Sequence, residues 1–325
     1  MKDNFADHLE KFFSHIIYRR GLSKHTASAY SDSFLMLFRY FQETKELKPN
    51  QITFQHFSKE SISCFCDWIE NVLGNSTSTR NQRLTAIHAF FRYVQSEEPA
   101  KLALCRDILS IRMKKQGAAP PKYLSMEAMK AILSAPDSNS HTGIRDLAIL
   151  CLLYDSATRV QELIDLKVND ITIAKPSTIR VTGKGNKVRV IPILPETAKI
   201  LEIYLKRYDL SMPDATLFTN RSGQSLTRVG ITYILNKYVS VVMESSPGLI
   251  PISVTPHIVR HTKASHLLAE GVNLIYIRDL LGHSSVITTE IYASTNPEFL
   301  HPKFPESLTR VVPPQKLDTA FPVCL

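Results

Sequence analysis

The sequence predicts a mainly α-helical protein with one small β-hairpin, an α+β fold divided into two domains. Apolar residues recur at helical spacing through most of the first ~110 residues. Strict alternation of apolar and polar residues begins only at residues 178–182. It returns at 187–193, after a Gly-Lys-Gly-Asn turn. A chain of 325 residues is longer than most single domains, which favours two.

Four helices are predicted in the first domain, residues 1–111. Each carries its apolar residues on one stripe, and two of them begin at serine, a favoured N-cap residue. Helices that each have one apolar face bury those faces against one another, so a compact helical bundle is expected. Their predicted positions are residues 5–20, from Ser23 to Phe41, from Ser58 to Val72, and from about Thr79 to Val94.

Residues 112–122 are basic, contain two prolines and lack apolar periodicity, which is typical of a linker. A second domain is predicted over residues 123–298, with the hairpin between its helices. Residues 299–325 contain several prolines and few regular signals, which indicates a tail. The helices of the second domain are expected near residues 125–134, 144–155, 159–168, 196–208, 227–242, 261–270 and 274–281.

The formal net charge of +9 favours a polyanionic partner, most commonly nucleic acid. The charge is spread along the chain. Residues 1–115 carry 17 Lys/Arg and 12 Asp/Glu, and the remainder carries 22 and 18, so both parts are basic. This distribution suits two domains that grip DNA together. On charge alone, a mildly basic protein without a nucleic-acid role is the alternative.

The five cysteines indicate free thiols in a reducing compartment, because Cys64 and Cys66 lie too close for an easy disulfide and no Cys-x-x-Cys pair occurs. No ligand cluster indicates a zinc site, and no metal or other cofactor is expected. There is no run of 18 apolar residues and no apolar signal segment after Met1. These features favour the cytoplasm without a membrane partner, and the predicted location is that of a bacterial, nucleoid-associated protein.

Three short motifs and the hairpin turn carry the functional signal. They are Ala157-Thr158-Arg159-Val160-Gln161-Glu162-Leu163, Gly183-Lys184-Gly185-Asn186-Lys187, Pro256-His257-Ile258-Val259-Arg260-His261-Thr262, and Leu280-Leu281-Gly282-His283-Ser284-Ser285 followed by Tyr292. Each alone is weak, but their order and spacing are specific. Together they resemble the tyrosine recombinases, the phage-integrase family. The resemblance is strong over residues 123–295, the family's catalytic domain. Over the N-terminal bundle it extends only in outline to the family's helical core-binding, SAM-like domain.

The resemblance implies a site-specific recombinase for integration, excision or transposition, an enzyme that breaks and rejoins DNA strands. Tyr292 would attack a backbone phosphate and form a 3′-phosphotyrosine bond. That bond keeps the phosphodiester energy, so neither ATP nor a metal is required. Arg159 and Arg260 match the family's two arginines. Their planar guanidinium groups suit the charge on non-bridging phosphate oxygens.

The same resemblance assigns the remaining site residues. Lys184 at the hairpin tip would protonate the leaving 5′-oxygen, with Lys187 as the competing candidate. His257 would accept the tyrosine proton or hydrogen-bond the phosphate, and His283 would donate a hydrogen bond to the phosphate. Glu162 would support the site by orienting its neighbours.

Double-stranded DNA carrying specific recombination sites is the expected partner. Strand exchange implies a homo-tetramer on synapsed DNA, with a related recombinase as a further possible partner. An apolar segment after Tyr292 is expected to dock on a neighbouring protomer, the alternative being that it folds back on its own domain or stays disordered. Target sequence, biological role among integration, transposition and dimer resolution, and cis or trans cleavage stay open. Candidate DNA contacts are Arg80, Arg83, Lys114, Lys115, Lys187 and Arg189.

The chain departs from the family pattern next to the first arginine. Ala157-Thr158 stands where the family often has Gly-Leu, and Gln161 replaces a common small residue. These changes remove no reacting group, although they bear on the local turn. Two other functions compete with a recombinase: a type IB topoisomerase, which uses similar chemistry on one duplex, and a catalytically silent DNA-binding protein with this fold.

Overall fold

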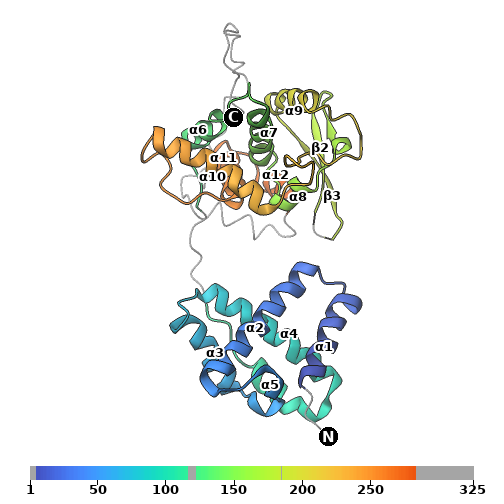
Figure 1. Cartoon of the computed structure of the whole chain (residues 1–325), viewed down its shortest axis with the longest axis vertical. Coiled ribbons are helices and arrows are strands. Elements are labelled where there is room, and N and C mark those ends of the chain that lie inside the picture. The colour runs from blue at the N-terminus through green and yellow to red at the C-terminus, as the bar shows by residue number, and fades with distance from the viewer. Residues whose placement is uncertain (1–4, 116–121, 184, 283–325) are drawn as a thin grey trace. The chain divides into compact units, whose positions relative to one another are not determined.

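The computed structural model describes residues 5–115, 122–183 and 185–282. The chain divides into two compact units, residues 1–118 and 119–325 (Figure 1). Both are built mainly from helices, and a three-stranded antiparallel sheet lies in the second. This confirms the predicted α+β class with a helical N-terminal domain. The predictions for Lys184, His283, Tyr292 and the tail 299–325 lie outside the described residues.

The described part of the N-terminal unit, residues 5–115, forms five α-helices joined by short turns. Serine side chains cap three of them by accepting a hydrogen bond from a first-turn amide, at Ser23, Ser58 and Ser76. The predicted first helix closes as a wider π-helical turn, His15–Arg19. The elements are α1 (Phe5–Ser14), α2 (Lys24–Lys45), α3 (Lys59–Asn71), α4 (Thr77–Glu97) and α5 (Leu102–Leu109), with 3-10 turns at Pro49–Gln51, Phe54–His56 and Pro99–Lys101.

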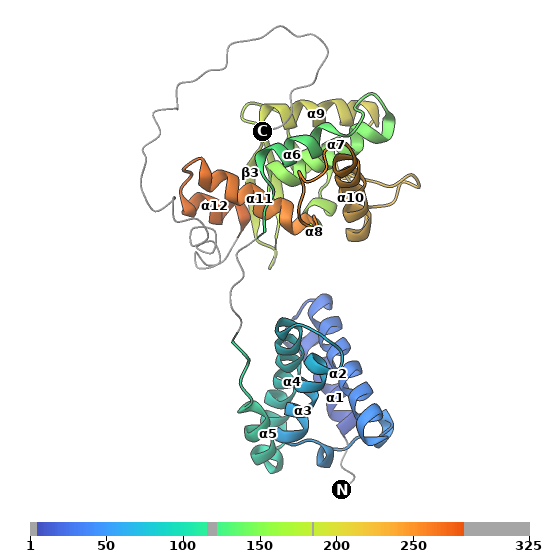
Figure 2. The same ribbon diagram turned by 90° about the vertical axis from the view of Figure 1, so that its left-hand side faces the viewer.

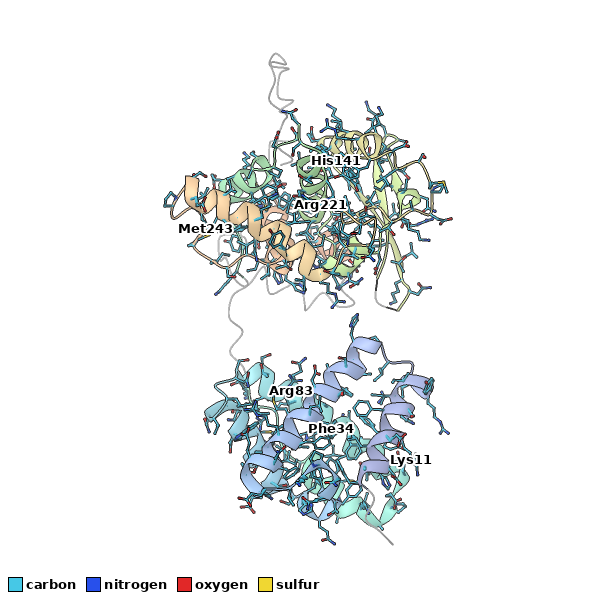
Figure 3. All side chains as sticks on the ribbon, viewed as in Figure 1. Lys11, Phe34, Arg83, His141, Arg221 and Met243 are labelled. Atoms are coloured by element: carbon cyan, nitrogen blue, oxygen red, sulfur yellow. The ribbon has the colours of Figure 1, made fainter. Side chains whose placement is uncertain are left out.

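Aromatic side chains fill the core of this unit. Helix α4 lies centrally and contacts α1, α2, α3 and α5. Phe90 on α4 meets Phe12 of α1 edge to face, with ring centroids 5.5 Å apart, and meets Phe34 of α2 at 5.4 Å. Phe34 points in among the helices (Figure 3). Edge-to-face packing of this kind adds to the free energy of burying the rings and fixes the helices against one another.

The second unit surrounds one buried helix. Twelve of the fifteen residues of α7 are buried, and this helix contacts α6, α8, α9, α10 and α11 (Figures 1 and 2). A helix that is buried on nearly all sides is typical of a position inside a domain. The elements are α6 (Met126–Ser134), α7 (His141–Asp155), α8 (Val160–Ile164), a 3-10 turn (Val168–Asp170), β1 (Ile171–Thr172), β2 (Thr178–Thr182), β3 (Val188–Pro192), α9 (Pro195–Arg207), α10 (Arg228–Ser245), α11 (Pro256–Ala269) and α12 (Leu274–Leu281).

The predicted hairpin is present as β2 and β3, paired in the register Thr182↔Val188 through Thr178↔Pro192. A short third strand, β1, pairs with β2 and has no periodic signal because it is two residues long. Helix α8 is shorter than predicted, since Arg159 is its N-cap and Asp165 its C-cap. Helix α11 begins five residues earlier than predicted, where Thr255 caps it and Pro256 occupies the first turn.

None of the described helices is long and apolar enough to cross a membrane. Among the cysteines that the structure describes, Cys64, Cys66 and Cys105 are free thiols. Within residues 5–115, 122–183 and 185–282, no group of three or more His, Cys, Asp or Glu side chains is placed to hold a metal ion.

Each unit contains a buried histidine held in its neutral form. The Nε2–H group of His266 donates to the Leu124 carbonyl at 2.9 Å, so Nδ1 accepts from the Tyr154 hydroxyl at 2.8 Å. His88 donates to the Ile108 carbonyl at 3.1 Å. Burial lowers the pKa of both rings, although their backbone hydrogen bonds oppose that shift.

These histidines should make the protein less stable in mild acid. The unfolded chain binds protons near pH 6.5 while the folded rings stay neutral, so stability is full above that pH and falls as pH decreases. We expect the urea midpoint to be lower at pH 5.5 than at 7.5, and His266→Gln to reduce that difference. Equal midpoints at both pH values would contradict this account.

Candidate active site

Arg159 is presented by a tight turn between α7 and α8. Ala157 in this turn has φ of +48°, in the left-handed region, and is fully buried. The backbone amide of Arg159 donates to Glu162 Oε2 at 2.8 Å, which closes the first turn of α8. Arg159 Nη1 also donates to Glu162 Oε1 at 2.8 Å, and 37% of its side chain remains exposed. The turn therefore holds the backbone of Arg159 rigidly and leaves part of its guanidinium accessible.

Glu162 is a buried carboxylate with two arginine partners. Arg189 from β3 binds it in a bidentate manner, with Nη2 to Oε2 at 2.7 Å and Nη1 to Oε1 at 3.1 Å. Burial alone would raise the pKa of Glu162. The hydrogen bonds and charges of Arg189 and Arg159 outweigh that effect and lower the pKa below its ordinary value. Glu162 is thus an anion that organises two cations.

Arg260 lies inside the same region. Only 4% of its surface is exposed. Its Nη1 donates to the Ala157 carbonyl at 2.6 Å and its Nη2 donates to the Leu281 carbonyl. The left-handed turn at Ala157 is what aims that carbonyl at α11. Arg260 therefore connects the turn before Arg159 with the end of α12.

Three guanidinium groups meet at the C-terminus of α12. Arg189 Nε donates to the Leu280 carbonyl at 3.2 Å, Arg260 to the Leu281 carbonyl, and Arg159 Nη2 to the Gly282 carbonyl at 3.3 Å. The last carbonyls of a helix lack intrahelical partners and carry partial negative charge, so they are good acceptors for cations. The carbonyls of three consecutive residues therefore bind three arginines, directly before His283 in the chain.

Two histidines lie one turn apart on α11. The ring centroids of His257 and His261 are 6.4 Å apart. His257 is solvent-exposed, yet partial desolvation, followed by the charges of Arg260 and Arg159, lowers its pKa. Partial burial and the neighbouring His257 and Arg260 lower the pKa of His261 in the same direction. The positive charges of Arg260 and Arg159 therefore favour the neutral form of the His257 ring.

Comparison with known proteins identifies the family. Residues 122–298 match the phage integrase family, and residues 9–98 match its N-terminal SAM-like domain. The chain belongs to the phage integrase family. A putative integrase/recombinase, y4rC, of Sinorhizobium fredii is 35% identical over 290 residues, 89% of this chain and 87% of the relative. Tyrosine recombinase XerC of Thermodesulfovibrio yellowstonii is 33% identical over 296 residues, 89% and 92% of the two chains.

Solved structures share the fold. XerH site-specific recombinase bound to difH substrate aligns with a TM-score of 0.67 at 21% identity, covering 84% of this chain and 77% of the other. The Tn1549 transposon integrase in complex with transposon right end DNA aligns with a TM-score of 0.69 at 16% identity, covering 89% and 98%. The family match and the relatives at 33% and 35% identity confirm the predicted function: the chain is a site-specific tyrosine recombinase that breaks and rejoins DNA, and a phosphotyrosine intermediate is general to its family.

The structure accommodates the departures from the family pattern. A left-handed alanine costs about 1–2 kcal/mol. Burial of its methyl group, worth roughly 0.8 kcal/mol, offsets part of that cost. The methyl group of Ala157 packs in a small cluster with Ala264, Ile277 and Leu281. Gln161 Nε2 donates to Oδ1 of Asp165, the C-cap of α8, at 2.8 Å, and Gln161 Oε1 accepts from Arg228 Nε of α10 at 2.8 Å. The turn that the family often builds with glycine therefore also forms here.

Two of the predicted DNA contacts lie in the interior instead. Arg80 is 5% exposed, because it lies one turn before the core residue Leu84 on α4, and it donates to the Arg112 carbonyl at 3.2 Å. Arg189 shares a strand face with the buried Ile191 and has Glu162 as its partner. Period-2 alternation in β3 is the sequence signal that could have placed Arg189 inward.

The other predicted DNA contacts lie nearer the surface. Lys187, on the hairpin, and Lys115 are exposed. Lys114 is exposed but forms ion pairs with Glu70 and, at 3.8 Å, with Asp67. Arg83 Nη1 donates to the Ala29 carbonyl and to Ser33 Oγ of α2, each at 3.3 Å.

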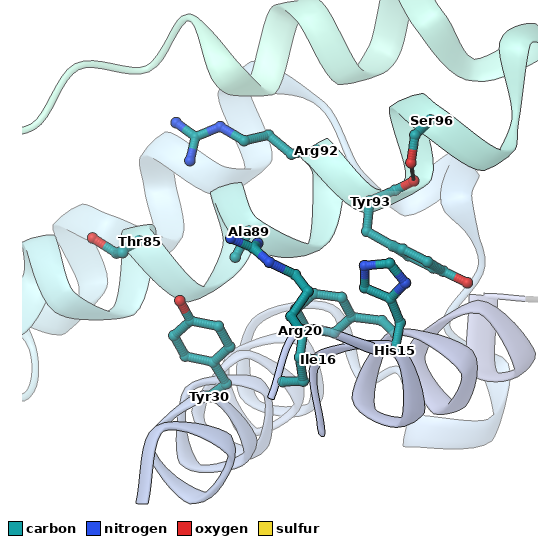
Figure 4. A pocket seen from close by; sticks show the side chains of 10 residues that line it. His15, Ile16, Arg20, Tyr30, Thr85, Ala89, Arg92, Tyr93 and Ser96 are labelled. Atoms are coloured by element: carbon teal, nitrogen blue, oxygen red, sulfur yellow. Dashed lines mark hydrogen bonds between the residues drawn. The ribbon is translucent and has the colours of Figure 1, made fainter. Parts of the chain in front are cut away.

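A basic hollow on the N-terminal unit was not predicted. It measures about 420 Å³ and lies between the π-helical turn, α2 and α4 (Figure 4). Arg20 and Arg92 are exposed at its edge, and no acidic side chain lines it. Its lining consists of Phe12, His15, Ile16, Arg20, Tyr30, Thr85, Ala89, Arg92, Tyr93 and Ser96. Arg20 follows a helix end and Arg92 falls on the outer face of α4, so only the fold brings the two together.

Substituting Gly282 should damage the arginine cluster. Gly282 has φ of +62°, and a Cβ atom there would lie 2.9 Å from Arg189 Nη1. Gly271 is the matched control, because its φ is +81° and a Cβ atom would meet nothing within 4 Å. We expect Gly282→Ala and Gly271→Ala each to lower the free energy of unfolding by about 1–2 kcal/mol.

Only Gly282→Ala should also slow DNA cleavage, by roughly tenfold or more, since it displaces a guanidinium from the site. Unfolding in urea and single-turnover cleavage measure the two effects. Equal cleavage rates in the two variants would show that the contact with Arg189 is unimportant.

Proposed function

We propose that Tyr292 is the nucleophile of strand cleavage and that Arg159 and Arg260 bind the scissile phosphate. Lys184, His257 and His283 complete the site. The observation that carries this proposal is the convergence of both arginines on the carbonyls of Leu281 and Gly282, immediately before His283 in the chain. The motif positions that are far apart in the sequence thus supply one cationic cluster.

The cluster has the charge that phosphoryl transfer requires. Three guanidinium groups and one carboxylate, from Arg159, Arg189, Arg260 and Glu162, leave a net charge of +2. In the reaction, the Tyr292 oxygen forms a bond to phosphorus while the bond from phosphorus to the 5′-oxygen breaks. Negative charge then spreads over the non-bridging oxygens. Fixed cations that need no reorganisation stabilise such a transition state most effectively.

Two groups would handle the protons. The lowered pKa of His257 keeps its ring neutral near pH 7, which supports a role in accepting the proton of the Tyr292 hydroxyl. Lys184 would return a proton to the leaving 5′-oxygen. Gly183, the residue before Lys184, lies beside this cluster, because a Cβ atom on it would be 3.2 Å from Glu162 Oε1. Lys187, whose carbonyl accepts from the Gly183 amide at 2.8 Å, is the alternative. His283 would donate a hydrogen bond to the phosphate, and Glu162 supports both arginines.

Double-stranded DNA with specific recombination sites is the proposed substrate. Structural neighbours include XerH bound to difH and a lambda integrase dimer bound to a COC′ core site. In this chain, Arg20 and Arg92 on the N-terminal unit and Lys187 on the hairpin are exposed cations suited to backbone phosphates. Exchange between two duplexes requires four active sites, so a homo-tetramer on synapsed DNA, with or without a related recombinase, follows. Integration, excision and transposition all fit this reaction.

The role of Tyr292 can be tested by trapping. On a nicked suicide substrate, the wild-type protein should leave an adduct that survives SDS, because the cleaved strand has no partner for rejoining. Tyr292→Phe should abolish the adduct, and Tyr276→Phe, an exposed tyrosine on α12, should not. An adduct that persists in the Tyr292→Phe protein would overturn the assignment.

Contacts from the basic hollow should appear in the salt dependence of binding. Removal of two phosphate contacts, in Arg20→Ala/Arg92→Ala, should reduce the slope of log affinity against log salt by about 2. The control, Arg39→Ala/Lys45→Ala on α2, removes the same charge outside the hollow. Gel-shift titrations over a range of salt concentrations measure both slopes. If the two double variants changed the slope equally, net charge and not the hollow would explain binding.

A further inference from the structure

Arg189 links three segments of the second unit that contribute to the proposed active site: the β-hairpin, the start of α8 and the end of α12. Helix α11 is the remaining segment of that site in the described part of the chain. The backbone of Arg189 belongs to β3, in the hairpin that carries Lys184 at its turn. Its guanidinium reaches Glu162 at the start of α8 and the Leu280 carbonyl at the end of α12. The side chain is only 16% exposed. Arg189 is therefore directed inward and is a poor contact for DNA, but it joins three parts of the chain.

Arg189 also determines how much of the Arg159 charge is available. Glu162 would neutralise Arg159 if it had no other partner. Instead, Arg189 binds both carboxylate oxygens, while Arg159 donates to one of them through a single side-chain nitrogen. The hydrogen bond from Arg189 is also the largest of the contributions that lower the pKa of Glu162. The second Arg159 nitrogen, Nη2, is directed at Gly282.

Two glycines pack against this guanidinium, and each directly precedes a proposed active-site residue. A Cβ atom on Gly183, before Lys184, would lie 3.2 Å from Arg189 Nη1. A Cβ atom on Gly282, before His283, would lie 2.9 Å from the same nitrogen. The backbones that lead into both residues therefore lie against the same nitrogen of this side chain. Only glycine permits that approach without displacing the arginine.

We propose that Arg189 is a positioning residue for DNA cleavage. It pairs with the negative charge of Glu162, so that the positive charge of Arg159 stays available to the phosphate. It also aligns the backbones before Lys184 and His283. This inference rests on the proposed function of those residues. Arg189 does not touch the reacting atoms. Its removal should therefore reduce the rate of cleavage and leave DNA affinity almost unchanged.

A matched pair of conservative substitutions tests the proposal. Arg180 on β2 is also a strand arginine paired with a carboxylate, at 2.9 Å from Asp170, but it is 54% exposed. Lysine can replace one point of contact but not the bidentate fork and the third donor. We expect Arg189→Lys to slow single-turnover adduct formation about 100-fold or more, with DNA affinity within about threefold of wild type. Arg180→Lys should cleave at the wild-type rate.

A second pair of variants separates the charge effect from folding. In Arg189→Gln, the Glu162 carboxylate has only Arg159 as its partner and neutralises it. In Glu162→Gln/Arg189→Gln, that negative charge is gone, so adduct formation should be at least tenfold faster than in Arg189→Gln. Arg189 would be excluded as a positioning residue if Arg189→Lys cleaved as fast as Arg180→Lys, or if the double variant were no faster than the single one. A wild-type protein that formed no adduct would overturn the proposed function itself.

Discussion

The structure depends on one buried carboxylate placed beside the end of a helix. Glu162 binds Arg159 and Arg189, and the last carbonyls at the C-terminus of α12 bind these two arginines and Arg260. Without these acceptors, three guanidinium groups would repel one another at this distance. Because a carboxylate and helix carbonyls offset that repulsion only partly, the cluster keeps positive charge that a phosphate can use.

The fold around the cluster can be understood as the means of assembling it. The buried α7 ends at the left-handed turn of Ala157, whose carbonyl bonds Arg260. The β-hairpin directs alternate residues inward, which places Arg189 on the same face as Ile191. Helix α12 ends at a glycine in the left-handed conformation, which leaves its last carbonyls unpaired within the helix. Local backbone rules at three sites thus produce one electrostatic feature.

Much of this was accessible from the sequence, since apolar periodicity predicted most helices and the hairpin, and the motifs predicted the family. The sequence did not predict the two-residue strand β1, which pairs through its backbone only. It also placed Arg80 and Arg189 outside, although Leu84 and Ile191 on the same faces are core residues. Arginine side chains were expected to be solvated, but Arg80 and Arg189 form hydrogen bonds with partners inside the fold. The basic hollow of Arg20 and Arg92 likewise requires helices distant in sequence.

The central claim is that the cluster acts by neutralising charge on the scissile phosphate. It is tested most directly by replacing that phosphate with a neutral methylphosphonate, which removes one negative charge but keeps the reacting bonds. Arg159→Ala should slow cleavage of the normal substrate roughly 10²–10³-fold, as expected for loss of one fixed donor. On the neutral substrate the same substitution should reduce the rate no more than about tenfold. An equal loss on both substrates would contradict the account and assign Arg159 a structural role.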